Sequence, residues 1–267
     1  MKKLDLNENR IVKKFLKNGY IIERILNKKN LNFISKSVFK SLKETGFFKN
    51  IIISNKTLNN LHKYVPSKEI NRVRLKIIND LKKNKEIRLN FFELIKKYLE
   101  LLVGNELAIQ KNINLVIAPP LDSSSILDIH ADTWGGNSPF EIVAWLPLVD
   151  CFKTKSMFIL DLKKTKKHNL EKMIRDKKNN FNAEDLYNKI KKDVTWPNVK
   201  FGEILLFNPM MPHGAKENTE VETRLSLNCR FKSIFSPYGD KKIGEYFEPL
   251  TVKPLSKIAF EYINEKI

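Results

Sequence analysis

Apolar and polar positions divide the chain into a helical part and a strand-rich part. Through residues 1–105 apolar side chains recur every three or four positions, which predicts amphipathic helices with one buried face. We expect helices over 9–19, over 31–45 with Asn30 as N-cap, over 70–81, and from just after Asn90 to Gly104. The run 19–25 predicts a short strand between the first two helices. These helices are expected to form a buttress that packs against a sheet.

After residue 105 the period changes to that of β-strands. Short apolar or alternating runs separated by Pro, Gly, Asn and Asp predict strands over 113–118, 126–133, 140–149, 156–160, 199–207 and 223–234. Many short strands with such turns are typical of a sandwich or a jelly roll. The segment 161–195 interrupts them with a Lys- and Asn-rich stretch that contains hints of short helices. Such an insertion could equally well form a lid over the barrel or a solvent-exposed surface loop.

The pattern predicts a single domain over residues 1–267. Its parts are a helical buttress (1–105), a β-barrel core (106–235) carrying the insertion 161–195, and a C-terminal extension (236–267). The chain has no internal repeat and no low-complexity linker, and 42% apolar residues are ample for a buried core. We therefore expect a mainly β fold with added α-helices.

The balance of charge is strongly basic, with a formal net charge of +19 and a pI near 9.7. A basic field attracts polyanions, but the lysines are scattered over nearly every predicted helix and do not interleave with aromatic residues. Nucleic acid is therefore not favoured as a partner, whereas an anionic small substrate remains open. No apolar run is long enough to span a membrane, and the N-terminus is too polar for a signal peptide. Together with Cys151 and Cys229 inside apolar runs, this predicts a cytoplasmic protein, of undetermined oligomeric state.

Candidate chemistry begins at His130 and Asp132. In a strand, residues two apart face the same side, so these two side chains would converge. The segment 209–214 supplies His213 on a short turn after another apolar run. Two histidines and one carboxylate form the facial set of non-haem Fe(II) oxygenases, which leaves three coordination positions open. A single His-x-Asp pair, taken alone, is better explained as a surface histidine beside an aspartate.

The run 224–230 alternates cleanly between polar and apolar residues. Its polar face, with Arg224, Ser226, Asn228 and Arg230, would point into a barrel. A buried arginine requires a partner, and a carboxylate fits its planar fork best. That partner is a protein carboxylate in most proteins. Here no Asp or Glu alternates opposite the run, which favours a carboxylate of a ligand.

Taken together, His130-x-Asp132, His213-Gly214 and Arg224-x-Ser226 resemble the signature of 2-oxoglutarate-dependent Fe(II) oxygenases. Arg224 follows His213 by eleven positions, close to the interval of that family, and the run 202–207 resembles the strand before its distal histidine. The runs 15–22 and 144–150 resemble the phytanoyl-CoA hydroxylase-like branch. More narrowly, the segment 130–141 is similar to oxygenases of bacterial carbohydrate and aminoglycoside gene clusters. The resemblance covers residues 112–234 well, the N-terminal helices loosely, and the part after Pro237 hardly at all.

The resemblance implies a double-stranded β-helix, a jelly-roll or cupin-like barrel. It implies that His130, Asp132 and His213 hold Fe(II), that Arg224 and Ser226 hold the cosubstrate 2-oxoglutarate, and that O2 is the oxidant. The implied enzyme is an oxidoreductase, a dioxygenase acting in carbohydrate biosynthesis, with release of succinate and CO2. Because halogenating relatives replace the carboxylate by a small residue, Asp132 favours hydroxylation or a related oxidation. Trp134 and Asn137 are candidate substrate contacts, although the segment before Thr195 lacks the Gly-Ser-His found in many relatives.

Two other interpretations stay open. A nucleic-acid dealkylase of the same superfamily also has two arginines six apart on one strand, as Arg224 and Arg230 are, although its interval from histidine to arginine is longer. Such an enzyme requires a basic groove and aromatic residues that stack a flipped base. Alternatively, the barrel is a non-catalytic module that binds a sugar or an anion. Consumption of 2-oxoglutarate distinguishes an enzyme from such a module.

Overall fold

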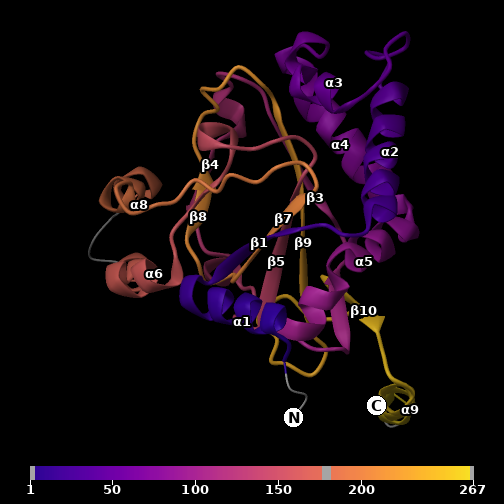
Figure 1. The fold of residues 1–267 in the computed structure, drawn as a ribbon, viewed down its shortest axis with the longest axis vertical. Helices are drawn as coiled ribbons and strands as arrows, with labels where there is room; N and C mark the ends of the chain where they lie inside the picture. Colours follow the sequence, from indigo (N-terminus) through magenta and orange to yellow (C-terminus); the bar gives the residue numbers. More distant parts are fainter. Residues whose placement is uncertain (1–3, 176–181, 265–267) are drawn as a thin grey trace.

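Two antiparallel sheets form the centre of the molecule (Figure 1). The computed structural model describes residues 4–175 and 182–264. The larger sheet has the order β1 (Tyr20–Arg24), β7 (Glu203–Phe207), β5 (Glu141–Pro147), β9 (Arg224–Ser233), β2 (Leu107–Gln110), β10 (Phe247–Thr251), and β3 (Asn114–Ala118) also pairs with β9. The smaller sheet has the order β4 (Leu127–His130), β8 (His213–Ala215), β6 (Phe158–Ile159). This is the predicted double-stranded β-helix.

Strand β9 lies at the middle of the larger sheet. One of its edges pairs with β5, and its other edge pairs first with β3 and then with β2. The predicted alternation is confirmed, because the apolar side chains of one face belong to the same core cluster as the helices: Leu225, Leu227, Cys229 and Phe231. Its polar side chains therefore face the other way, toward the smaller sheet.

The N-terminal helices cover the outer, apolar face of the larger sheet, as the predicted buttress requires (Figure 1). They are α1 (Leu6–Asn18), α2 (Lys28–Glu44), α3 (Asn55–Asn59), α4 (Ser67–Lys83) and α5 (Lys85–Leu102), with a 3-10 turn over Leu61–Lys63. The rings of Phe91 on α5 and Phe231 on β9 lie 6.3 Å apart. Helices and sheet thus share one apolar core.

All four predicted helices begin earlier in the structure than the sequence pattern indicated, α1 at Leu6 and α4 at Ser67, and two of them have a different N-cap from the one expected. Helix α2 begins at Lys28 and not at Leu31, because Asn27 rather than Asn30 is its N-cap and accepts a hydrogen bond from the Asn30 amide. Helix α5 begins at Lys85, six residues before the predicted start at Phe91, because Asn84 caps it. The Asn90 side chain donates to the Glu86 carbonyl inside the helix. In each of these two helices, two asparagines could serve as N-cap. The structure uses the earlier one, Asn27 rather than Asn30 in α2 and Asn84 rather than Asn90 in α5.

The insertion 161–195 forms the short helices α6 (Leu162–His168), α7 (Leu170–Arg175) and α8 (Ala183–Ile190), with residues 176–181 outside the described part of the chain. Leu170, Leu186 and Ile190 pack in one cluster with Ile129 of β4 and Phe158 of β6. Ile129 precedes His130, so the two side chains lie on opposite faces of the smaller sheet. The insertion therefore covers the outer face of that sheet (Figure 1) and buttresses the histidine strands from behind.

The remaining elements are short turns and the C-terminal extension, whose helix α9 lies apart from the two sheets (Figure 1). Three further 3-10 turns span Ser123–Ser125, Asp132–Gly135 and Lys153–Lys155, and the C-terminal extension contains β10 and α9 (Pro254–Asn264). Strands β2 and β10 were missed by the pattern analysis, because β2 is four residues long with every residue buried and so shows no alternation. None of the described helices has the length and apolarity needed to cross a membrane.

Gly214 is the residue that lets the strands of the smaller sheet approach one another. A Cβ at this position would lie 2.6 Å from the Leu127 carbonyl oxygen and 2.7 Å from the Phe158 ring. Gly214→Ala is therefore expected to destabilise the protein by about 1 to 3 kcal/mol, because backbone must move to accept the methyl group. Chemical denaturation of the metal-free protein measures this.

Gly135→Ala is the matched control, since a Cβ there meets no atom within 4 Å. It should unfold at the same denaturant concentration as the parent. Equal stability of Gly214→Ala and Gly135→Ala would show that β4, β8 and β6 are not packed as described.

Candidate metal centre

Strands β4 and β8 place the two histidines side by side. His130 and His213 are directly paired across the two strands, and their ring centroids lie 4.3 Å apart. The prediction that His213 lies on a turn is wrong, because His213 is the first residue of β8. The strand is too short, at three residues, to give an alternating pattern. Its pairing with β4 nevertheless fixes both imidazoles on the inner face.

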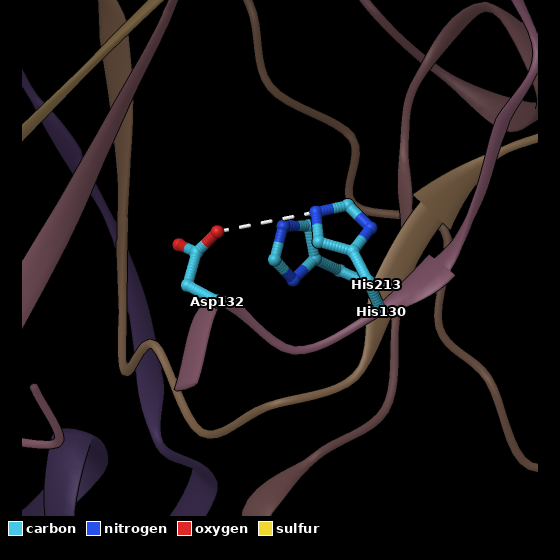
Figure 2. A group of neighbouring side chains, drawn as sticks. All are labelled: His130, Asp132 and His213. Atoms are coloured by element: carbon cyan, nitrogen blue, oxygen red, sulfur yellow. Dashed lines mark ion pairs between the residues drawn. The ribbon is translucent and has the colours of Figure 1, made fainter. Parts of the chain in front are cut away.

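Asp132 completes the group, although not as part of a strand. The predicted strand over 126–133 is wrong at its end, because β4 stops at His130 and Asp132 begins a 3-10 turn. Gly136, at φ 84°, donates its backbone N–H to the Asp132 carbonyl and turns the chain. The carboxylate still points at the histidines (Figure 2), with Oδ1 3.9 Å from His130 Nε2. Ligand atoms from all three residues lie within 4.8 Å of one another.

Both imidazoles are fixed in orientation by their own backbone. His130 Nδ1 lies 2.8 Å from the Asp128 carbonyl oxygen, and His213 Nδ1 lies 2.9 Å from the Met211 carbonyl oxygen. Since a carbonyl only accepts, each Nδ1 carries the proton and donates it. Each Nε2 then presents a lone pair to the shared centre, which is the form in which histidine binds a metal ion.

Arg230 holds the carboxylate of Asp132. Its Nε donates to Oδ2 at 3.0 Å and its Nη2 donates to Oδ1 at 2.5 Å, while Nη1 reaches Gln110 and Tyr246. The sequence pattern placed Arg230 on the inner face of β9 and favoured a ligand carboxylate as partner for the arginines of that face. For Arg230 this expectation is wrong, because its partner is the carboxylate of Asp132. Residues 98 positions apart leave no local pattern, so only the fold could bring them together. A carboxylate has about four lone-pair directions. Asp132 can therefore accept both hydrogen bonds from the guanidinium and still offer a lone pair to a metal ion.

The protonation states of these groups suit metal binding. Burial alone would raise the pKa of Asp132, but Arg230 and the two histidines outweigh it and hold that pKa below its usual value. Burial is also the main cause that lowers the pKa of His213 to about 4. Burial likewise opposes the charge on Arg230, yet Asp132 raises its pKa above the usual value. At neutral pH the centre therefore has an ionised carboxylate and a neutral His213.

A second group of buried polar atoms surrounds Arg224, at the start of β9. Arg224 is 4% exposed, and its Nη1 donates to the Ser156 carbonyl oxygen at 2.7 Å. Within the described residues no carboxylate pairs with it, and burial lowers its pKa. Arg224 Nε and the hydroxyls of Ser226 and Ser156 are buried without a hydrogen-bond partner. Ser156 was not among the predicted site residues, because a lone serine in a strand-like run gives no signal.

These two groups fit the ligands that the sequence resemblance implies. Two imidazole nitrogens and one carboxylate oxygen on one side of a centre form the facial set that binds Fe(II). A buried guanidinium without a protein carboxylate requires an anion, since an unpaired buried charge is costly. The unpaired donors on Arg224 and Ser226 suit a ligand carboxylate, and both residues share the inner face of β9 with Arg230.

The other candidate residues occupy different surroundings. Trp134 is partly buried against the cluster formed by the insertion and the smaller sheet. The Asn137 amide donates to Glu141 at 2.7 Å, and the Asn137 side chain is 9% exposed. Asn228 accepts a hydrogen bond from Asn114 across the pairing of β9 with β3. Asn137 and Asn228 thus already have protein partners.

Comparison with known proteins supports the fold. No protein-family model matches the sequence, and the search of curated proteins gave no match. The structure resembles EvdMO1, with a TM-score of 0.55 and 13% identity over 85% of this chain, which spans 50% of that protein. It also resembles AviO1 from Streptomyces viridochromogenes Tue57, with a TM-score of 0.50 and 11% identity over 89% of this chain and 100% of that one. At such identity the likeness establishes a shared fold.

Arg230→Lys tests whether Arg230 positions the metal-binding carboxylate. A lysine keeps the positive charge but cannot donate two parallel hydrogen bonds, so Asp132 loses its fixed orientation. Loss of such a supporting partner typically weakens metal affinity about 10- to 100-fold. Calorimetric titration of the metal-free protein with Mn²⁺ or with anaerobic Fe(II) measures the change. Arg88→Lys, which alters an ion pair with Glu248 away from the centre, should leave the affinity unchanged.

The stability of the metal-free protein should depend on pH through His213. Its folded pKa of about 4 lies below the unfolded value of 6.5, so the unfolded chain binds a proton more readily. His213 therefore favours folding fully above pH 6.5, and that contribution falls as the pH drops from 6.5 to 4. Denaturation midpoints across this range, compared with those of His213→Gln, isolate the effect. Parallel pH profiles for the two proteins would contradict a buried neutral His213.

Proposed function

We propose that this chain is an Fe(II)- and 2-oxoglutarate-dependent dioxygenase that oxidises a small organic substrate. The reaction converts substrate, 2-oxoglutarate and O2 into oxidised substrate, succinate and CO2. The observation that carries the proposal is the convergence of His130, Asp132 and His213. The buried guanidinium of Arg224, which has no carboxylate partner among the described residues and which the metal set alone would not require, adds an independent argument.

The three ligands and their supports have distinct tasks in this proposal. His130 and His213 would bind Fe(II) through Nε2, because each Nδ1 is engaged by a backbone carbonyl. Asp132 would bind through a carboxylate oxygen that Arg230 holds in place. When bound, Fe(II) supplies the activation of O2 that couples decarboxylation of 2-oxoglutarate to oxidation of a substrate C–H bond. Because all three protein ligands lie on one side, positions remain for the cosubstrate and for O2.

The cosubstrate would lie between the metal centre and Arg224. Arg224 and Ser226 would bind the distal carboxylate by charge-assisted hydrogen bonds, which orients the 2-oxo acid end toward the histidines. Apolar side chains line the inner face of the larger sheet between the metal centre and Arg224. Strand pairing puts Val143, Phe207 and Val116 on the same face as Arg230 and Ser226. Such walls exclude water and strengthen the electrostatic hold on the cosubstrate.

For the substrate we propose a small anionic or carbohydrate-derived molecule. The net charge of +19 favours an anionic substrate. The likeness of segment 130–141 to carbohydrate and aminoglycoside oxygenases favours a sugar. Presence of Asp132 favours hydroxylation or a related oxidation over halogenation.

The two alternatives make different demands on the same site. A nucleic-acid dealkylase would use both arginines of β9, but here the fork of Arg230 engages Asp132, a protein carboxylate. A non-catalytic barrel would bind the anion and consume nothing. Turnover of 2-oxoglutarate in the presence of sugar nucleotides, acyl-CoA thioesters or alkylated oligonucleotides distinguishes the three, since stimulation by one class identifies the substrate.

The proposed metal centre is tested by its visible spectrum. Anaerobic addition of Fe(II) and 2-oxoglutarate should give the charge-transfer band expected when a 2-oxo acid chelates ferrous iron. His213→Ala should abolish the band, because it removes one of three ligands. His168→Ala is the control, since His168 pairs with Asp193 on the insertion and should leave the band intact. A band that survives in His213→Ala would exclude the proposed ligand set.

Arg224→Lys tests the cosubstrate pocket separately. A lysine cannot reproduce two parallel hydrogen bonds to one carboxylate, and charge-assisted bonds contribute ~1.5 to 3 kcal/mol each. Affinity for 2-oxoglutarate should fall by roughly one to two orders of magnitude. Affinity for the metal should hardly change, because Arg224 contacts none of the three ligands. A variant that folds and binds 2-oxoglutarate like the parent would reduce Arg224 to a structural residue.

A further inference from the structure

The guanidinium of Arg230 is held from two sides. Toward the metal centre, Nε and Nη2 donate to the two carboxylate oxygens of Asp132. On the far side, Nη1 donates to Gln110 Oε1 at 3.1 Å and to the Tyr246 hydroxyl at 3.3 Å. Because Nη1 carries two hydrogens, these two acceptors satisfy both of them. The plane of the guanidinium is therefore fixed by acceptors that lie away from the metal centre as well as by Asp132.

Tyr246 reaches Arg230 from the C-terminal extension, which the sequence resemblance hardly covers. Its backbone N–H donates to the Lys242 carbonyl at 3.0 Å, and its carbonyl accepts from the Lys111 N–H at 2.9 Å. Its ring packs edge-on against Phe247, with ring centroids 5.0 Å apart. Since both backbone and ring are held, the hydroxyl is pre-organised to accept from Nη1.

The same extension also contacts the turn that carries Asp132. The backbone N–H of Asp240 donates to the Gly136 carbonyl at 2.9 Å. Gly136 is the residue whose left-handed conformation turns the chain after Asp132, and a Cβ on it would lie 3.0 Å from the Asp240 Cβ. One stretch of the extension, residues 240–246, thus contacts both the turn of Asp132 and the arginine that holds its carboxylate.

We propose that Tyr246 is a positioning residue for the metal centre, which acts through Arg230 to fix the direction in which Asp132 presents its carboxylate to the ion. Gln110 of β2 supports Arg230 in the same way. The inference rests on the proposed function, in which His130, Asp132 and His213 bind Fe(II). It gives the C-terminal extension a part in a site whose other residues lie between positions 130 and 230.

The test compares two tyrosines of the extension. The metal-free parent, Tyr246→Phe and Tyr238→Phe are each titrated with Mn²⁺ by calorimetry. Tyr246→Phe removes the hydroxyl and keeps the ring, so Arg230 loses one acceptor and Asp132 part of its fixed orientation. Its Mn²⁺ affinity should fall about three- to tenfold, less than the roughly 10- to 100-fold expected when a direct partner of a metal ligand is lost.

Tyr238→Phe is the matched control. The Tyr238 ring also packs edge-on against Phe247, at 6.2 Å, but its buried hydroxyl has no hydrogen-bond partner among the described residues. This variant should bind Mn²⁺ like the parent. Affinity separates positioning from packing, because a tyrosine that only packs would lower the denaturation midpoint of the metal-free protein and leave the Mn²⁺ affinity unchanged.

Two further variants test whether the effect passes through Arg230. Arg230→Lys has no Nη1, so adding Tyr246→Phe to it should cause no further loss of affinity. Gln110→Met removes the other acceptor of Nη1 and should weaken Mn²⁺ by a factor similar to that of Tyr246→Phe. If Tyr246→Phe does not fold, Gln110→Met decides the question in its place.

Three results would each overturn the inference: an unchanged Mn²⁺ affinity in Tyr246→Phe or in the substitute Gln110→Met, an equal loss in Tyr238→Phe, or losses that multiply when Tyr246→Phe is combined with Arg230→Lys. A parent that does not bind Mn²⁺ would instead overturn the metal centre of the proposed function. The two failures are therefore told apart by the parent protein alone.

Discussion

The alternation of strand β9 is the constraint on which the molecule depends. Because successive side chains point to opposite faces, one ten-residue strand lines the helical core with apolar groups and the barrel interior with polar ones. A shift of one residue in its pairing would exchange the two sets and bury Arg224 and Arg230 among the helices. The cost of burying two unpaired guanidinium groups therefore fixes the register of the larger sheet.

Sequence reasoning succeeded where periodicity was long and failed where geometry depended on tertiary pairing. The inner face of β9 was predictable from a run of alternating residues, and the grouping of His130, Asp132 and His213 was predictable from their residue types and spacing. The end of β4 was not, because a backbone turn at Gly136 overrides the apparent strand and still leaves Asp132 facing the histidines. The contacts of Arg230 with Asp132 and of Ser156 with Arg224 were not predictable either, since each joins residues far apart in sequence.

The insertion shows how a segment's role follows from the face that it covers. Its lysines and length fit a lid or an exposed excursion, but Leu170, Leu186 and Ile190 are buried against the outer side of the smaller sheet. That sheet has only three short strands, so its outer face would otherwise expose Ile129 and Phe158 to water. The described part of the insertion thus completes a layered arrangement in which helices back both sheets.

The backbone carbonyls that hold the imidazoles have a consequence for metal selection. With both rings already turned and their tautomers set, the chain supplies two nitrogens and an oxygen before any ion arrives. Three ligands of this kind bind several divalent ions. The affinity of such a ligand set rises from Mn²⁺ and Fe²⁺ toward Ni²⁺ and Cu²⁺. If the centre binds a metal ion as proposed, the ion that it holds would therefore depend on the metal supply around the protein as well as on its three ligands.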